Sequence, residues 1–89
     1  MSRQIRFNGR ETAVMRAIGF GLGISGKDLQ ERLQMGHDDM ADVLSTLMEL
    51  GYVETASARE RVYQEDYEAE MFEINPSYVA DLKIVLKRD

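Results

Sequence analysis

Apolar residues recur every three or four positions through the first half of the chain, a spacing that predicts helices. The first helix is expected over about 9–21, because Asn8 followed by Glu11 has the pattern of a capping box. A second helix follows Ser25, which acts as its cap, with Asp28 as the reciprocal acid. The positions expected on or beside the buried stripes are Val14, Met15, Ala17, Ile18, Gly21, Leu22, Leu29 and Leu33.

A third helix, over about 38–50, has the most regular apolar face. It follows the predicted turn at Met35-Gly36-His37, and Gly51 ends it, as glycine commonly does just past a helix. Its apolar side chains fall at i, i+3, i+4, i+7 and i+10 and are Met40, Val43, Leu44, Leu47 and Leu50. The three helices together predict a helical core.

Beyond Gly51 the pattern favours strands. A strand begins at Tyr52-Val53-Glu54-Thr55, its antiparallel partner is expected from Tyr67 to Ile74, and residues 56–66 form the tip of that hairpin. Asn75 and Pro76 then open a last helix, as its cap and its first helical residue. Ahead of the first helix, Ile5 and Phe7 indicate either a short strand or a docking arm.

The last helix has an apolar stripe for which two interpretations stay open. The stripe consists of Tyr78, Val79, Leu82, Val85 and Leu86. It can pack on the first helix, or it can pair with its twin in a homodimer. The 89 residues form a single domain, with a core over about 9–75 and the C-terminal helix over about 76–88. A chain of this length has a small core and is marginal alone, which favours the homodimer.

The net charge of −5 is concentrated in one window of the sequence. Residues 33–58 contain no Lys or Arg, whereas the other 11 acidic residues of the chain balance its 11 basic ones. The acids of the window are Asp38, Asp39, Asp42, Glu49 and Glu54. The third helix is therefore predicted to be acidic, which disfavours non-specific binding to phosphates.

The sequence favours neither a targeting signal nor a catalytic or metal-binding motif. The N-terminal residues lack the apolar run of a signal peptide, no stretch approaches the roughly 20 apolar residues of a membrane span, and there is no Cys. Gly21-Leu22-Gly23-Ile24-Ser25-Gly26 fits G-x-G-x-x-G, but a helix precedes it instead of a strand. His37 beside Asp38 and Asp39 does not form a convergent metal site. We expect a cytoplasmic binding protein without membrane contact, and neither an enzyme nor a holder of a cofactor or metal.

Several of these positions have the spacing of a known family. They are Ile24-Ser25, Leu29, Leu33, Met35, Met40, Leu44, Leu47, Gly51-Tyr52-Val53-Glu54 and Ile74-Asn75-Pro76. Over about residues 9–78 the chain resembles the winged helix-turn-helix of MarR-type bacterial and archaeal transcriptional regulators. The resemblance implies an α+β, mainly α fold, with a three-helix core, a β-hairpin wing and a C-terminal helix.

The resemblance also implies a transcriptional regulator that binds double-stranded DNA as a homodimer. In the family the third helix presents its first residues to the major groove, here His37, Asp38, Ala41, Asp42 and Ser45. Wing arginines that enter a minor groove correspond to Arg59 and Arg61, and Lys27 is a candidate for phosphate contact. Further basic residues, which bias the N-terminal half, are Arg3, Arg6, Arg10, Arg16 and Arg32.

An alternative function follows from the charge of the third helix. None of its candidate contact residues is the Arg, Lys, Asn or Gln that makes paired contacts with guanine or adenine. A carboxylate ~5–6 Å from a phosphate costs on the order of 3 kcal/mol before salt screening, at an effective dielectric constant of about 20. The alternative is a protein-interaction winged helix whose acidic third helix docks on a basic protein partner.

Overall fold

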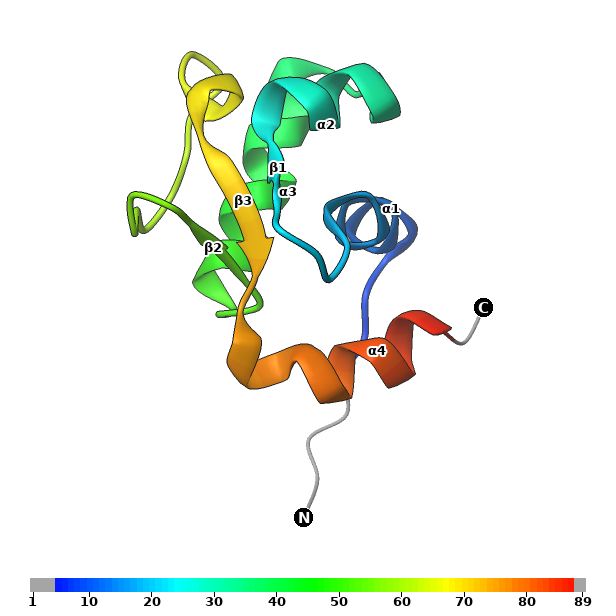
Figure 1. Cartoon of the computed structure of the whole chain (residues 1–89). Helices are drawn as coiled ribbons and strands as arrows, with labels where there is room; N and C mark the ends of the chain where they lie inside the picture. The colour runs from blue at the N-terminus through cyan, green and yellow to red at the C-terminus, as the bar shows by residue number, and fades with distance from the viewer. Residues whose placement is uncertain (1–4, 88–89) are drawn as a thin grey trace.

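Helices and a small sheet pack around a common core in the computed structural model, which describes residues 5–87. Arg3, one of the basic residues of the N-terminal half, and the predicted end of the last helix at 88 lie outside these residues. In Figure 1 the sheet lies along one side, and α4 crosses the end of the molecule opposite α2. The elements in chain order are α1 (Gly9–Ile18), β1 (Ile24–Ser25), α2 (Gly26–Leu33), α3 (His37–Glu49), β2 (Val53–Thr55), the 3-10 helix η1 (Tyr67–Ala69), β3 (Met71–Ile74), the 3-10 helix η2 (Pro76–Tyr78) and α4 (Val79–Lys87).

The predicted capping box opens α1. The Asn8 side chain accepts a hydrogen bond from the Glu11 N–H at 2.7 Å, and the Glu11 carboxylate accepts one from the Asn8 N–H at 3.0 Å. The helix ends at Ile18 instead of 21, because Gly19 adopts φ 68°, outside the helical region. The prediction of Gly21 and Leu22 on or beside the buried stripe is therefore wrong: both are exposed, and the Leu22 side chain is 99% accessible.

The sheet has three antiparallel strands in the order β1-β3-β2. Its central strand β3 begins at Met71 instead of Tyr67, and Tyr67–Ala69 form η1. The reason is strand alternation. Phe72 and Ile74 are buried, so a strand extended back to residue 67 would turn Glu68 and Glu70 toward the core. The predicted strand therefore breaks before Met71.

The core is formed mainly by apolar side chains from the three helices and the sheet. Leu50 is an exception to the predicted stripe of α3, because the helix ends at Glu49 and leaves Leu50 52% exposed. Burying one Leu or Met side chain contributes about 1.5–3 kcal/mol. Because α3 buries several such side chains, it contributes strongly to the stability of the core. Large side chains with less than 2% exposure are Val14, Met15, Leu29, Met40, Leu44, Leu47, Val62, Tyr67, Phe72 and Leu82.

The N-terminal arm and α4 close one end of the core. Ile5 and Phe7 pack against the core outside any strand, which confirms the docking-arm interpretation. The Phe7 and Tyr78 rings both meet Tyr52 edge to face, with centroids 5.5 and 5.0 Å apart. The Asn75 side chain caps the turn into η2 by accepting a hydrogen bond from Ser77 N–H, as predicted. No helix among residues 5–87 has the length and apolar character needed to cross a membrane.

Candidate nucleic-acid interface

The first residues of α2 hold it close to the chain that returns from the wing. Ser25 caps α2 by accepting a hydrogen bond from Asp28 N–H at 3.1 Å, as predicted. Gly26 then donates its N–H to the Glu70 carbonyl at 2.9 Å. A Cβ at Gly26 would collide with the Tyr67 carbonyl, so this close approach requires glycine. The start of α2 and η1 are therefore one packed unit.

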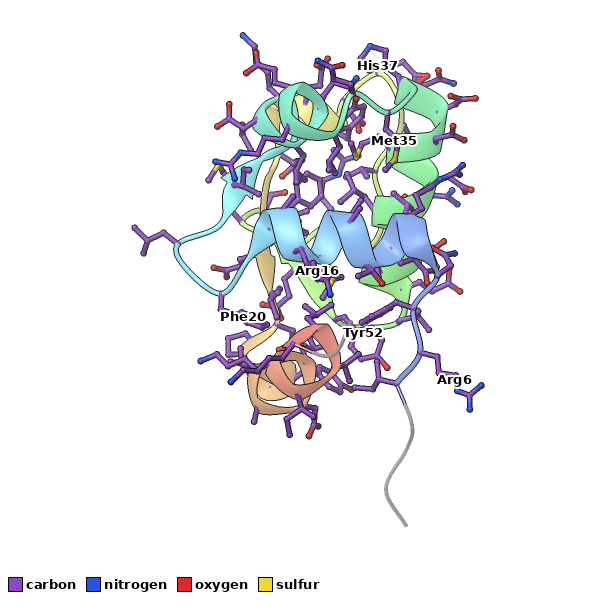
Figure 2. The ribbon with its side chains drawn as sticks, turned by 90° about the vertical axis from the view of Figure 1, so that its right-hand side faces the viewer. Arg6, Arg16, Phe20, Met35, His37 and Tyr52 are labelled. Carbon is purple, nitrogen blue, oxygen red and sulfur yellow. The ribbon has the colours of Figure 1, made fainter. Side chains whose placement is uncertain are left out.

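The turn between α2 and α3 leaves the first residues of α3 exposed. Gln34 ends α2 in the left-handed region with φ 51°, and α3 begins at His37. Figure 2 shows His37 at the far end of the molecule from Arg6, with Met35 pointing inward beneath the turn. The exposed edge of α3 is formed by Asp38, Asp42, Thr46 and Glu49. The charged side chains of this edge are all acidic.

Ser45, which we predicted to contact DNA, is buried with 8% exposure. Its hydroxyl donates to the Val62 carbonyl at 2.8 Å and lies 3.1 Å from the Val62 N–H, which donates to it. Val62 belongs to the crossing segment, residues 56–66, which leads from β2 to η1. Val62 is 1% exposed, and Ala41 is also buried. The crossing segment therefore packs against α3, and the Ser45 hydroxyl serves this contact inside the chain.

The two predicted wing arginines differ in their surroundings. The Arg59 guanidinium donates to Asp66 at 2.8 Å and to Glu70 at 3.2 Å, and its side chain is 28% exposed. Hydrogen bonds from Arg59 and from the Tyr63 N–H hold the pKa of Asp66 below its ordinary value. Arg61 is exposed instead, with its guanidinium carbon 5.1 Å from the centre of the Tyr63 ring. Of these two arginines, Arg61 is the one available to a partner.

The remaining charges near α3 are mixed. Lys27 and Arg32 of α2 are exposed, whereas Arg10 pairs with Asp39 at 3.3 Å. Asp42 and Arg61 line the same hollow between α3 and the crossing segment. On the outer face of the strand pair, Glu54 stands directly opposite Glu73 in the register. The wing and α3 thus present more carboxylates than cations.

A hydrogen-bonded group at the tip of α3 was not predicted from the sequence. His37 Nδ1 lies 2.7 Å from the Tyr67 hydroxyl, which donates to Gln30 Oε1 at 2.9 Å. The Tyr67 side chain is buried, and desolvation raises its pKa, so the hydroxyl stays protonated at neutral pH. The sequence contains one sign of this group. Tyr67 does not fall on the alternate positions that Phe72 and Ile74 occupy in the strand, which marks where the chain leaves the sheet and turns to the helices.

Part of the α4 stripe is used inside the chain. Leu82 and Leu86 are buried in the common core, and Tyr78 and Val79 pack against it. Val85 is half-buried, and the neighbouring Ile84 is 61% exposed. The Arg16 guanidinium, which Figure 2 shows on α1, donates to the Leu86 carbonyl at 2.9 Å. The apolar surface that α4 leaves accessible is therefore centred on Ile84 and Val85.

Within residues 5–87 no group of three or more His, Asp or Glu side chains could hold a metal ion. The arrangement defines instead a winged helix-turn-helix domain: a helix-turn-helix, an antiparallel strand pair joined by the crossing segment, and a C-terminal helix.

Comparison with solved structures confirms this fold as MarR-like. The crystal structure of the multiple antibiotic-resistance repressor (MarR) from Listeria monocytogenes superposes with a TM-score of 0.58 at 19% sequence identity. The match covers 91% of this chain and 62% of the Listeria chain, so the chain spans less than two thirds of that structure. No family model and no curated protein matches the sequence. At this identity the likeness concerns the fold.

Proposed function

We propose that the protein is a transcriptional regulator that binds double-stranded DNA as a homodimer. The observation that carries the proposal is the MarR-like helix-turn-helix itself, with the first turn of α3 exposed at its tip. Lys27 of α2 and Arg61 of the crossing segment would contact phosphates, because both are exposed. His37 and Asp42 would face the bases, while Ser45 and Arg59 would support the surface from within.

Binding of labelled genomic fragments at several salt concentrations tests the DNA contact. Lys27→Ala and Arg61→Ala should each weaken binding and lower the slope of log affinity against log salt by about 1, because each removes one phosphate contact. The matched control is Lys83→Ala, which removes the same charge from α4, where the lysine lies 5.6 Å from the Phe20 ring centre. Equal effects of all three variants, or no binding by folded protein, would contradict the proposed contact.

The homodimer is proposed to form through α4. Ile84 and Val85 would meet their counterparts, because Leu82 and Leu86 are already committed to the core of one chain. Sedimentation equilibrium should give twice the chain mass for the natural protein and the single mass for Ile84→Glu. Ala56→Glu, at an exposed position of the crossing segment, is the matched control and should remain dimeric. A single-chain mass for the natural protein at high concentration would refute this interface.

The acidic edge of α3 favours a second candidate, docking on a basic protein partner. Asp38, Asp42 and Glu49 are exposed along one edge of the helix. Changing Asp38 and Asp42 together to Asn should strengthen binding to DNA if a duplex approaches this edge, because two repulsive charges are removed. The same variant should weaken binding to a basic protein segment, for which oligolysine is the probe. The direction of the two changes separates the candidates.

A further inference from the structure

The Tyr67 hydroxyl lies between Gln30 of α2 and His37 of α3, within hydrogen-bond distance of both. A phenol has one proton, and Tyr67 donates it to Gln30 Oε1 at 2.9 Å. With that proton on the Gln30 side, the Tyr67 oxygen accepts from His37 Nδ1 at 2.7 Å. The tautomer that fits this arrangement has a hydrogen on Nδ1, and in the neutral imidazole it leaves Nε2 with an unshared lone pair.

The groups beside this lone pair are also hydrogen-bond acceptors. His37 is exposed at the start of α3, and the carboxylates of Asp38 and Asp42 follow on the exposed edge of the helix. Carboxylates and an unprotonated Nε2 all accept hydrogen bonds and donate none. The first two turns of α3 thus present a row of acceptors to whatever approaches them.

Such a row fits base edges that carry amino groups. In the major groove cytosine presents its N4 amino group and adenine its N6 amino group, whereas guanine presents O6 and N7 and thymine O4, all acceptors. We propose that His37 is a specificity-determining residue, which accepts a hydrogen bond through Nε2 from the amino group of cytosine or adenine, and that Tyr67 positions it. This inference rests on the proposed binding to DNA, and Asp38 and Asp42 add to the same preference.

The tautomer of His37 is measurable without DNA. Nitrogen-15 spectra of the free protein at about pH 8, where an ordinary imidazole is neutral, should show a protonated Nδ1 and an unprotonated Nε2. His37 is the one histidine in the chain, so the assignment is direct. Tyr67→Phe, which keeps the buried ring but removes the hydroxyl, should shift the population toward protonated Nε2. A protonated Nε2 in the natural protein would overturn the proposal.

Selection from a library of random duplexes tests the base preference. Recovered duplexes should be enriched in one base pair in one orientation at one or more positions, and His37→Ala should reduce that preference about tenfold at one of them. Lys83→Ala, on α4, should leave the preference unchanged. The same selection with Tyr67→Phe should show a weakened preference at the His37 position.

The outcomes separate this inference from the function on which it rests. Binding without base preference, or a preference that His37→Ala leaves unchanged at every position, would overturn the role of His37 and leave DNA binding intact. Absence of binding to every duplex by folded protein would overturn both. A basic peptide bound by the same acceptor row, with no duplex bound, would assign the surface to a protein partner instead.

Discussion

The Ser45 hydroxyl fastens the crossing segment to α3. It satisfies both the N–H and the carbonyl of Val62, which is 1% exposed. Because Val62 is buried, water would not replace the hydroxyl as the partner of these two backbone groups, and an unsatisfied buried polar group is costly. A serine on the face expected to meet DNA thus has a role inside the chain.

Ser45→Ala should lower the free energy of unfolding by about 1–3 kcal/mol, because two buried Val62 groups lose their partner. Thr46→Ala, at the next and exposed position of the same helix, should change it by less than about 0.5 kcal/mol. Urea denaturation of both variants measures the difference. Equal stability of the two would show that the hydroxyl contributes nothing to the packing of the crossing segment.

Asp66 gives the crossing segment a pH dependence with a defined sign. Its pKa is held below the ordinary value of 3.8 by hydrogen bonds from Arg59 and the Tyr63 N–H. A carboxyl with a lowered folded-state pKa stabilises the protein above the unfolded pKa, and this contribution is lost as the pH falls through the folded-state pKa. The natural protein should therefore exceed Asp66→Asn in stability at neutral pH, with the gap closing below about pH 4. Urea denaturation across pH measures the gap, and one that widens in acid would contradict the assignment.

At the scale of elements, η1 sets how α2 meets the sheet. Tyr67 sends its hydroxyl to Gln30 of α2 and to His37 of α3, while the Glu70 carbonyl accepts from Gly26 N–H. The segment that returns from the wing is therefore bonded to both helices of the helix-turn-helix. This geometry depends on the missing side chain at Gly26.

Gly26→Ala should destabilise the fold by about 1–3 kcal/mol, because its Cβ would be forced against the backbone carbonyl of Tyr67. Gly9→Ala is the matched control, since nothing lies within 4 Å of a Cβ there. That change should be neutral or stabilise by about 0.4–1 kcal/mol, through the lower entropy of the unfolded chain. Thermal melting of both variants gives the comparison, and a tolerated Gly26→Ala would show that η1 can move away from α2.

For the whole molecule, α4 has one side buried against the core and another side exposed. Its inward side chains Leu82 and Leu86 complete the core of one chain, and Ile84 remains 61% exposed. A domain of 89 residues has few side chains to spare, so the loss of one buried leucine is a large fraction of its stability.

Leu82→Ala should lower the free energy of unfolding by about 2–5 kcal/mol, through lost burial and the cavity left behind. Ile84→Ala should change the stability of a single chain by less than about 0.5 kcal/mol. Denaturation at low protein concentration, where association is negligible, makes the test. Similar losses for both would place Ile84 in a buried contact.

The sequence by itself determined the local features of this protein. Caps at Asn8, Ser25 and Asn75 and the apolar spacing of α3 depend on residues three or four positions apart, so the order of the helices could be predicted. The winged-helix fold was predicted from the resemblance to MarR-type regulators. The acidity of α3 could also be predicted, because the charged residues of a segment are read directly from the sequence.

Only the tertiary structure decided which candidate residues face outward. Ser45 and Val62 are 17 positions apart, His37 and Tyr67 are 30 apart, and Gln30 and Tyr67 are 37 apart. Those contacts arise because the crossing segment turns back onto α3 and η1 packs on α2, a path that no local periodicity specifies. The burial of Ser45, the ion pairs of Arg59 and the contact between His37 and Tyr67 all follow from that path.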